Sequence, residues 1–181
     1  MEIQDAYSSK GRYYHTLQHL GTMHDMLQEV PGSIDRMELT LFALFYHDIV
    51  YDPLRSDNEE RSAEIAVKRL GEGGLDLASV EWVRQAILAT KGHKTQENSD
   101  VNFLLDADLA VLGFGPSDYE AYTQAIRKEY AIIPDLIYKP GRKKVLRGFL
   151  DMDSIFKTVP FQQKFEQQAR ININEELKKL N

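Results

Sequence analysis

His47 and Asp48 stand inside the apolar run LFALFYHDIVY, where groups that bind protons or metals interrupt a hydrophobic segment. A carboxylate in such a run is predicted to be buried, and an unpaired buried charge is very costly. No lysine or arginine lies near it in the same predicted helix, so the charge calls for a metal ion or a basic side chain from elsewhere. Adjacent residues point about 100° apart around a helix, yet they can converge on one ion beside it.

The run LLDADLAVLG carries a second interruption, with Asp106 and Asp108 among apolar residues. On a helix the two side chains lie roughly 200° apart, so they are predicted to face different surroundings. The residues three and four positions from Asp108 are all large and apolar, whereas those around Asp106 form a less hydrophobic set. Asp108 is therefore predicted to face the interior. Asp106 is predicted either to lie on the surface or to contact a metal-binding residue without binding the metal itself.

A third group is the pair His15 and His19 in RYYHTLQHL. A spacing of four places both histidines on one face of a helix. That face is next to the apolar stripe of the same helix, so one or both histidines are predicted to reach the interior. The stripe consists of Leu17, Leu20, Met23 and Leu27.

Two histidines and two aspartates from three predicted helices make a mixed nitrogen and oxygen ligand set, which suits Mn, Fe, Co, Ni, Zn or Mg better than Cu(I). The chain has no cysteine, which excludes a thiolate zinc site and a cysteine nucleophile. A divalent cation held in this way lowers the pKa of a bound water and polarises a phosphoryl oxygen. Asp48 is also predicted to orient or deprotonate that water. The predicted ligands are His19, His47, Asp48 and Asp108.

Helical periodicity dominates the elements that must position these residues. No strand alternation and no linker are evident, so the prediction is a single compact all-α bundle over residues 1–181. Asp57 and Glu60 match a capping box at one helix start. The predicted helices run from Tyr13 to the Pro31–Gly32 break, from Ser33 or Asp35 to Tyr51, and over 57–70, 76–90, 101–112, 119–133, 141–155 and 161 to the C-terminus.

The net charge of −6 disfavours a nucleic-acid polymer as partner, because phosphate-backbone binding needs clustered positive charge. A small anionic substrate is compatible with that charge if the pocket is locally basic. No segment reaches the roughly 18 apolar residues that a membrane span requires. The N-terminal residues lack the apolar stretch of a signal peptide, so a cytoplasmic location and no membrane partner are expected. Amphipathic helix faces are compatible with a homodimer.

Several polar residues outside the ligand set are candidates for catalysis or phosphate binding, each with a plain structural alternative. Glu60 is a candidate general acid or base, although it also fits the capping box. Lys91 follows a helix, where positive charge is favoured by the helix dipole. Arginine forks suit phosphate groups. The predicted substrate-binding residues are Arg12, His15, Lys91, His93 and Arg127.

The ordered set His19, His47-Asp48 and Asp108 resembles the HD superfamily of metal-dependent phosphohydrolases, and a subgroup described only as predicted enzymes of that kind. The resemblance extends from about Arg12 into the last predicted helix. It implies a helical fold, a divalent metal on these residues and hydrolysis of a phosphoester such as a nucleotide, and it leaves the substrate open. The segments that carry it are YHTLQHL, FYHDIVYD, NEERSA, ILATKGH, LDADLAVLG and IRKEY.

Two other functions use the same residues. A regulatory module would keep the metal site as a nucleotide sensor and release its ligand intact. An HD-fold oxygenase with a di-iron site would need more ligands than four, and His15 and His93 are the spare ones. Two metal ions per chain would favour that oxygenase.

Overall fold

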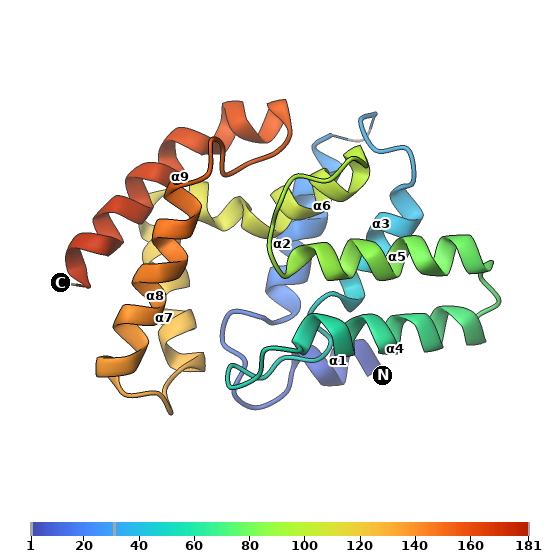
Figure 1. Cartoon of the computed structure of the whole chain (residues 1–181), viewed down its shortest axis with the longest axis horizontal. Helices are drawn as coiled ribbons and strands as arrows, with labels where there is room; N and C mark the ends of the chain where they lie inside the picture. Colours follow the sequence, from blue (N-terminus) through green and yellow to red (C-terminus); the bar gives the residue numbers. More distant parts are fainter. Residues whose placement is uncertain (1, 31, 181) are drawn as a thin grey trace. The chain divides into compact units, whose positions relative to one another are not determined.

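Helices make up all the regular structure in the computed structural model, which describes residues 2–30 and 32–180. No strand occurs in those ranges, so the predicted all-α class is confirmed. Within them, no helix combines the length and the apolarity that a bilayer crossing requires. The elements in Figure 1 are α1 (Glu2–Tyr7), α2 (Leu17–Gln28), α3 (Met37–Tyr46), α4 (Asn58–Glu72), α5 (Leu77–Thr90), α6 (Ser99–Leu109), the 3₁₀ turn η1 (Ala110–Gly113), α7 (Pro116–Glu129), α8 (Asp135–Leu150) and α9 (Val159–Lys179).

Contacts between residues divide the chain into an N-terminal unit, residues 1–108, and a C-terminal unit, residues 109–181. In the N-terminal unit α4 and α5 pack side by side, and α3 packs on both of them (Figure 1). Buried positions recur every three or four residues along α4 and α5, as expected for helices that share a core. These positions are Ala63, Ala66, Leu70, Val80, Val83 and Ile87.

Two helices begin after an aspartate that could cap them, but only one of these aspartates does so. Asp76 caps α5, because its carboxylate accepts from the backbone N–H groups of Ala78 and Ser79. The predicted capping box at Asp57 is wrong. Asp57 does precede α4, but it makes no side-chain cap, and its carboxylate instead accepts from the guanidinium of Arg55.

The start of α3 is capped from a distant part of the chain. Both carboxylate oxygens of the buried Asp100 on α6 accept backbone N–H groups, from Asp35 at 3.0 Å and from Arg36 at 2.8 Å. These are donors that a helix start leaves without partners. The cap therefore ties α6 to α3 at their N-terminal ends.

Two predicted helix bounds near the histidines are wrong. Residues 13–16 are not helical, and α2 starts only at Leu17, so His15 and His19 do not share a helix face. Helix α3 ends at Tyr46, so His47 is its C-terminal cap and Asp48 lies in the turn that follows. Periodicity failed there because side chains, rather than helical bonds, hold the backbone of 48–52. Pro31, predicted to end the first helix, lies outside the described residues.

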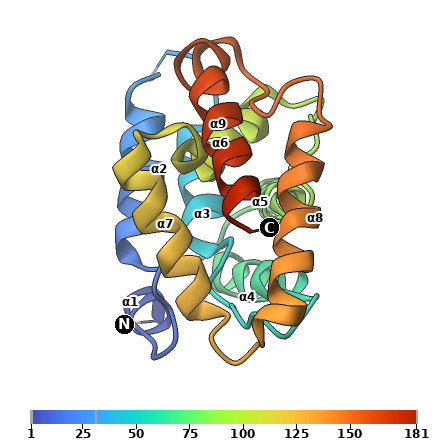
Figure 2. The ribbon, with the colours of Figure 1, turned by 90° about the vertical axis from the view of Figure 1, so that its left-hand side faces the viewer.

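The C-terminal unit is built from η1 and helices α7, α8 and α9, with the end of α9 between α7 and α8 (Figure 2). Helix α8 starts earlier than the predicted Gly141, because Pro140 is accommodated inside it. Gly113 lies against α9 so closely that a Cβ there would be 2.5 Å from Cβ of Phe165. Only glycine allows that approach.

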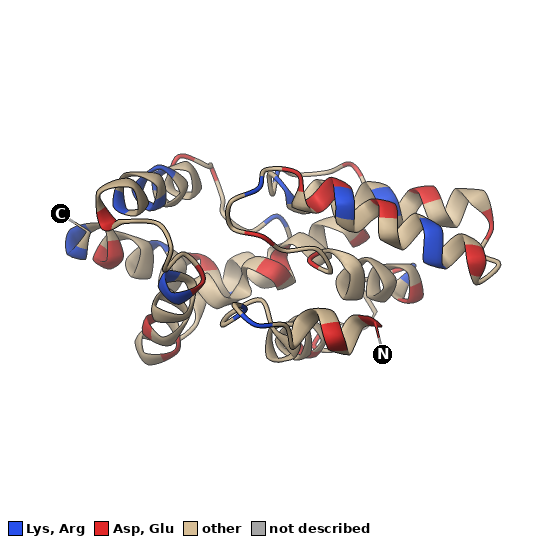
Figure 3. Cartoon of the chain, turned by 90° about the horizontal axis from the view of Figure 1, so that it is seen from below, with Lys and Arg blue, Asp and Glu red and all other residues tan. Residues whose placement is uncertain are grey.

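Charge is distributed differently along the two units. Residues 1–108 carry 19 acidic and 10 basic side chains, whereas residues 109–181 carry 9 acidic and 12 basic ones. Figure 3 shows acidic and basic residues mixed along the helices. The N-terminal unit is therefore net acidic and the C-terminal unit is net basic.

Candidate metal centre

Three side chains of the N-terminal unit converge so that one atom of each lies within 4.8 Å of the others. They are His19 on α2, His47 at the end of α3 and Asp108 on α6. The histidines are 4% and 1% exposed, which places their donor atoms out of bulk water. Two imidazoles and a carboxylate at such spacing form a recognised set of ligands for a divalent cation.

The imidazole of His47 is oriented by its own helix. Its Nδ1 lies 2.7 Å from the carbonyl oxygen of Leu44, which must accept, so Nδ1 carries the proton. The Nε2 lone pair is then directed at the cluster. Fixing a ring through its other nitrogen is how proteins prepare a histidine ligand.

Nε2 of His19 and Nε2 of His47 are buried, and neither has a hydrogen-bond partner among the described residues. The Asp108 Oδ1 atom lies 3.2 Å from the first and 3.8 Å from the second, close enough for attraction but without hydrogen-bond geometry. Buried polar atoms are seldom left in this state. A cation among the three donors would satisfy all of them, so the residues fit a metal ion.

Asp48 lies at the edge of this group. Its Oδ2 is 3.3 Å from Nε2 of His47 and 3.7 Å from Nε2 of His15, and its side chain is 14% exposed. His15 is held by stacking on the ring of Tyr51, with centroids 4.1 Å apart. Asp48 is absent from the tightest group of three, and its role as a fourth ligand stays a prediction.

His93 approaches the cluster from the loop after α5. Its Nε2 is 2.8 Å from Oδ2 of Asp108, so the two oxygens of that carboxylate face different histidines. His93 has a φ of 47°, a left-handed conformation that residues other than glycine rarely adopt. Local strain of this kind persists where the surroundings hold a side chain in one place.

The charges of the cluster shift one another's pKa values. Burial alone would lower the pKa of His47, but the negative charge of the nearby Asp48 outweighs it and raises this pKa to about 9. Burial opposes ionisation of Asp48, yet the neighbouring His47 lowers the Asp48 pKa to about 2. Burial also lowers the pKa of His19. The metal-free site therefore holds an ionised Asp48 beside a protonated His47 at neutral pH.

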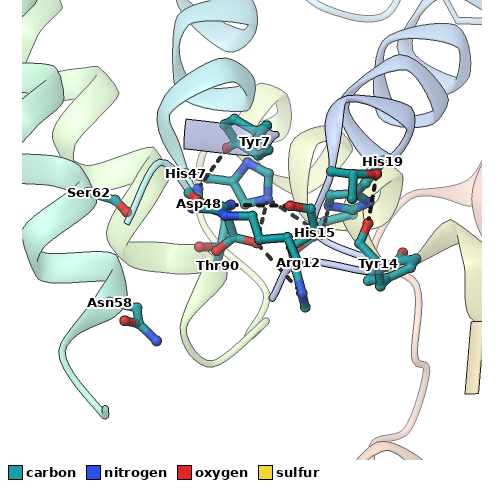
Figure 4. A network of polar contacts seen from close by, with 12 residues as sticks. Tyr7, Arg12, Tyr14, His15, His19, His47, Asp48, Asn58, Ser62 and Thr90 are labelled. Atoms are coloured by element: carbon teal, nitrogen blue, oxygen red, sulfur yellow. Dashed lines mark hydrogen bonds and ion pairs between the residues drawn. The ribbon is translucent and has the colours of Figure 1, made fainter. Parts of the chain in front are cut away.

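Side chains from α1 and α4 hold the backbone of the turn that carries Asp48 (Figure 4). Tyr7 Oη accepts a hydrogen bond from the backbone N–H of Asp48. Ser62 Oγ accepts one from the N–H of Val50 and donates one to the carbonyl oxygen of the same residue. The side-chain amide of Asn58 accepts a hydrogen bond from the backbone N–H of Asp52 and donates one to the carbonyl oxygen of Asp52. Sequence reasoning missed all three partners. The segment NEERSA contained two of them but gave no indication of what they bind.

Arg12 belongs to the same support. Its guanidinium donates to the carbonyl oxygens of Asp48 at 2.7 Å, Ile49 at 3.0 Å and His15 at 3.2 Å, and it lies over the ring of Tyr7. Three of its bonds are thus directed at the chain rather than at a ligand. These hydrogen bonds join the segment that carries His15 to the turn that carries Asp48. The binding of phosphate by Arg12 stays a prediction.

The remaining predicted site residues lie apart from the cluster's contacts. Lys91 donates to Glu60 at 2.5 Å and to the Ser56 carbonyl at 2.6 Å, so these two candidates bind one another. Arg127 belongs to the C-terminal unit, where it pairs with Asp135. The catalytic role of Glu60 and the phosphate contacts of Lys91 and Arg127 stay predictions.

The predicted order of burial for the two aspartates of α6 is wrong. Asp106 is 0% exposed, whereas the side chain of Asp108 is 15% exposed. Apolar neighbours along the helix indicated Asp108 as the more interior. Helix α6 is instead buried on nearly every side, that of Asp106 included, and Asp108 faces the polar cluster.

The chain was compared with models of protein families, with curated proteins and with solved structures. No family model, no curated protein and no solved structure matches the chain. The function is therefore inferred from the site.

Proposed function

We propose that this chain is a metal-dependent phosphohydrolase of the HD type, acting on a small phosphoester such as a nucleotide. One observation carries the proposal: two buried histidine Nε2 atoms, which have no hydrogen-bond partner among the described residues, face the carboxylate of Asp108. The order His19, His47-Asp48, Asp108, which resembles that superfamily, supports the same function.

His19, His47 and Asp108 would hold the cation, with Asp48 as the fourth ligand. A divalent cation in such a site lowers the pKa of water and polarises a phosphoryl oxygen. The Asp48 carboxylate, 3.3 Å from Nε2 of His47, would orient an attacking water and accept a proton from it. His93 holds the second oxygen of Asp108 and keeps that carboxylate oriented.

Metal content and hydrolysis measured together test this function. Protein purified without chelator is expected to contain about one transition-metal ion per chain, and to hydrolyse a phosphomonoester or nucleotide with that metal. The Asp108→Asn variant preserves shape but weakens a ligand, so metal and activity are both expected to fall. His24→Ala is the control, because His24 is a histidine of α2 with a side chain 42% exposed.

If the wild-type protein holds no ion after addition of Mn, Fe, Co, Ni, Zn and Mg in turn, the proposed function is wrong. If it holds a metal but binds nucleotides without cleaving them, a sensing module takes its place.

A second candidate is a site for two metal ions, as in a di-iron oxygenase. His93 at 2.8 Å from Asp108 and His15 at 3.7 Å from Asp48 favour it, because each aspartate then has one more histidine within reach, besides His19 and His47. Two ions per chain and an iron-dependent absorption band would support this candidate over the first.

A further inference from the structure

The C-terminal unit contains a cavity of about 540 Å³ between α7, α8 and α9. Its volume is in the range of sites for small organic ligands, which are commonly about 300–1,000 Å³. Tyr119 and Tyr138 contribute rings to its wall, and Ile171 and Leu180 contribute aliphatic surface. Figure 2 shows the end of α9 between the two other helices. All the lining residues belong to this one unit.

The polar floor of the cavity is satisfied by the protein itself. The buried Glu176 receives two hydrogen bonds from the guanidinium of Arg142, at 2.7 and 3.0 Å, and one from Tyr119 Oη at 2.6 Å. The Asn172 side chain donates to the Leu112 and Phe114 carbonyl groups. These hydrogen bonds already satisfy Glu176 and Asn172, so neither side chain needs a ligand as a partner.

Among the described residues, the charged groups of the cavity wall are also paired, with one exception. Lys179 pairs with Glu120 at 2.6 Å, Arg127 with Asp135 at 2.7 Å, and Glu175 with Lys178 at 2.6 Å. Lys139 is half-buried and lines the same cavity. Within residues 2–30 and 32–180 it has no hydrogen bond, ion pair or ring contact.

We propose that this cavity binds a small organic anion with an apolar or aromatic body, and that Lys139 pairs with the anionic group. Because the other charges of the wall neutralise one another in pairs, the ammonium group supplies the net charge that a ligand meets. A hydrogen bond between ammonium and an anion is about twice as strong as one between neutral groups. The two tyrosine rings and the aliphatic side chains would contact the body of the ligand.

The number of unpaired cations sets the charge of the ligand. A polyphosphate needs several free basic groups, and the described residues of the cavity wall offer one, Lys139. A single carboxylate, sulfonate or similar group on a ring-sized body is the chemistry that fits. This site is separate from the metal centre, whose residues all belong to the other unit, so the proposal does not depend on the proposed function.

Anilinonaphthalene sulfonate, an aromatic monoanion, is a suitable probe for titration by fluorescence. EDTA is added so that no metal contributes to binding. The wild-type protein is expected to bind the probe saturably, and Lys139→Gln is expected to bind it about tenfold more weakly. Lys144→Gln is the matched control, because Lys144 lies on the same helix, is exposed and is absent from the cavity wall.

A neutral relative of the probe, phenylnaphthylamine, separates charge recognition from loss of shape. Its affinity is expected to be the same in Lys139→Gln and wild-type protein, and the circular dichroism of both should agree. Thr123→Trp, which adds bulk to the cavity wall, should weaken both probes. Equal binding of the anion by Lys139→Gln and wild-type protein would overturn the proposal. So would an equal loss in Lys144→Gln, full binding by Thr123→Trp, or no saturable binding.

Discussion

The two units each bury a cluster of polar side chains, but the clusters differ in how well the chain satisfies them. In the C-terminal unit, Arg142 and Glu176 meet in a two-bond ion pair to which Tyr119 adds a third bond. In the N-terminal unit, the buried Nε2 atoms of His19 and His47 find no hydrogen-bond partner in the part of the chain that the structure describes. A buried polar cluster that is complete stabilises the fold, whereas one that is incomplete indicates a ligand.

The largest effect is expected from Arg142→Met. This change leaves Glu176 buried without its cation, which typically costs about 3–5 kcal/mol of unfolding free energy. Urea denaturation would measure the loss, and metal content should be unchanged. Arg147→Met on the same helix removes an exposed arginine and should cost about 0.5 kcal/mol or less. A similar loss for both variants would mean that the buried pair has no special role.

The metal-free N-terminal cluster is expected to respond to pH. The His47 pKa is raised from 6.5 to about 9, so its stabilising effect is complete below pH 6.5 and is lost as the pH rises through 9. With about 1.4 kcal/mol for each pKa unit, the loss is about 3 kcal/mol. The lowered pKa of His19 acts in the opposite sense, by reducing stability as the pH falls below 6.5.

Denaturation in EDTA at several pH values between 6.5 and 9 would measure this loss. Asp48→Asn is the comparison, because it removes the charge that raises the His47 pKa, and its stability should change less over the same range. Stability that is constant or rises with pH in the wild-type protein would contradict the assigned charge state. In the presence of a bound metal the dependence should disappear, because the ion replaces the proton.

A smaller effect is expected from Arg12→Gln, which removes hydrogen bonds to the Asp48 and Ile49 carbonyl groups. Hydrogen bonds from a charged donor are each worth about 1.5–3 kcal/mol, and the glutamine would retain part of that. The affinity for Mn²⁺, measured by calorimetry, should fall about tenfold while the stoichiometry stays the same. Arg61→Gln, an exposed change on α4, should bind Mn²⁺ like the wild type. Unchanged affinity in Arg12→Gln would show that the turn keeps its shape without this support.

The smallest effect is expected from Asp100→Asn, because an amide oxygen can still accept one of the two N–H groups at the start of α3. Loss of half a cap costs about 1 kcal/mol. Thermal unfolding without metal would detect it, with Asp25→Asn, whose side chain is 78% exposed, as the control. A loss equal to that of Arg142→Met would contradict this ranking.

The sequence was sufficient to predict the helical class and the convergence of His19, His47 and Asp108, because polar groups in apolar runs are conspicuous at any tertiary arrangement. It was not sufficient to predict the turn after His47. That turn is set by Tyr7 and Arg12, which are far from it in the chain. Local periodicity cannot report contacts over such distances.

The burial of Asp106 shows the same limit. Its neighbours along the helix are less hydrophobic than those of Asp108, yet it is the more buried of the two. How fully each side chain of α6 is covered depends on the helices around it, which its neighbours in the sequence do not show. The sequence therefore predicted the side chains of the candidate metal site, and the structure was needed to find the residues that hold them in place.

The close approach at Gly113 has an evolutionary consequence. A Cβ at this position would lie 2.5 Å from Cβ and 2.8 Å from the carbonyl oxygen of Phe165, so every other amino acid would displace the backbone of α9. Related sequences with this fold should keep glycine there under purifying selection, whatever reaction they catalyse. An invariant glycine at this position would therefore record a packing constraint and should not be counted among the markers of a shared activity.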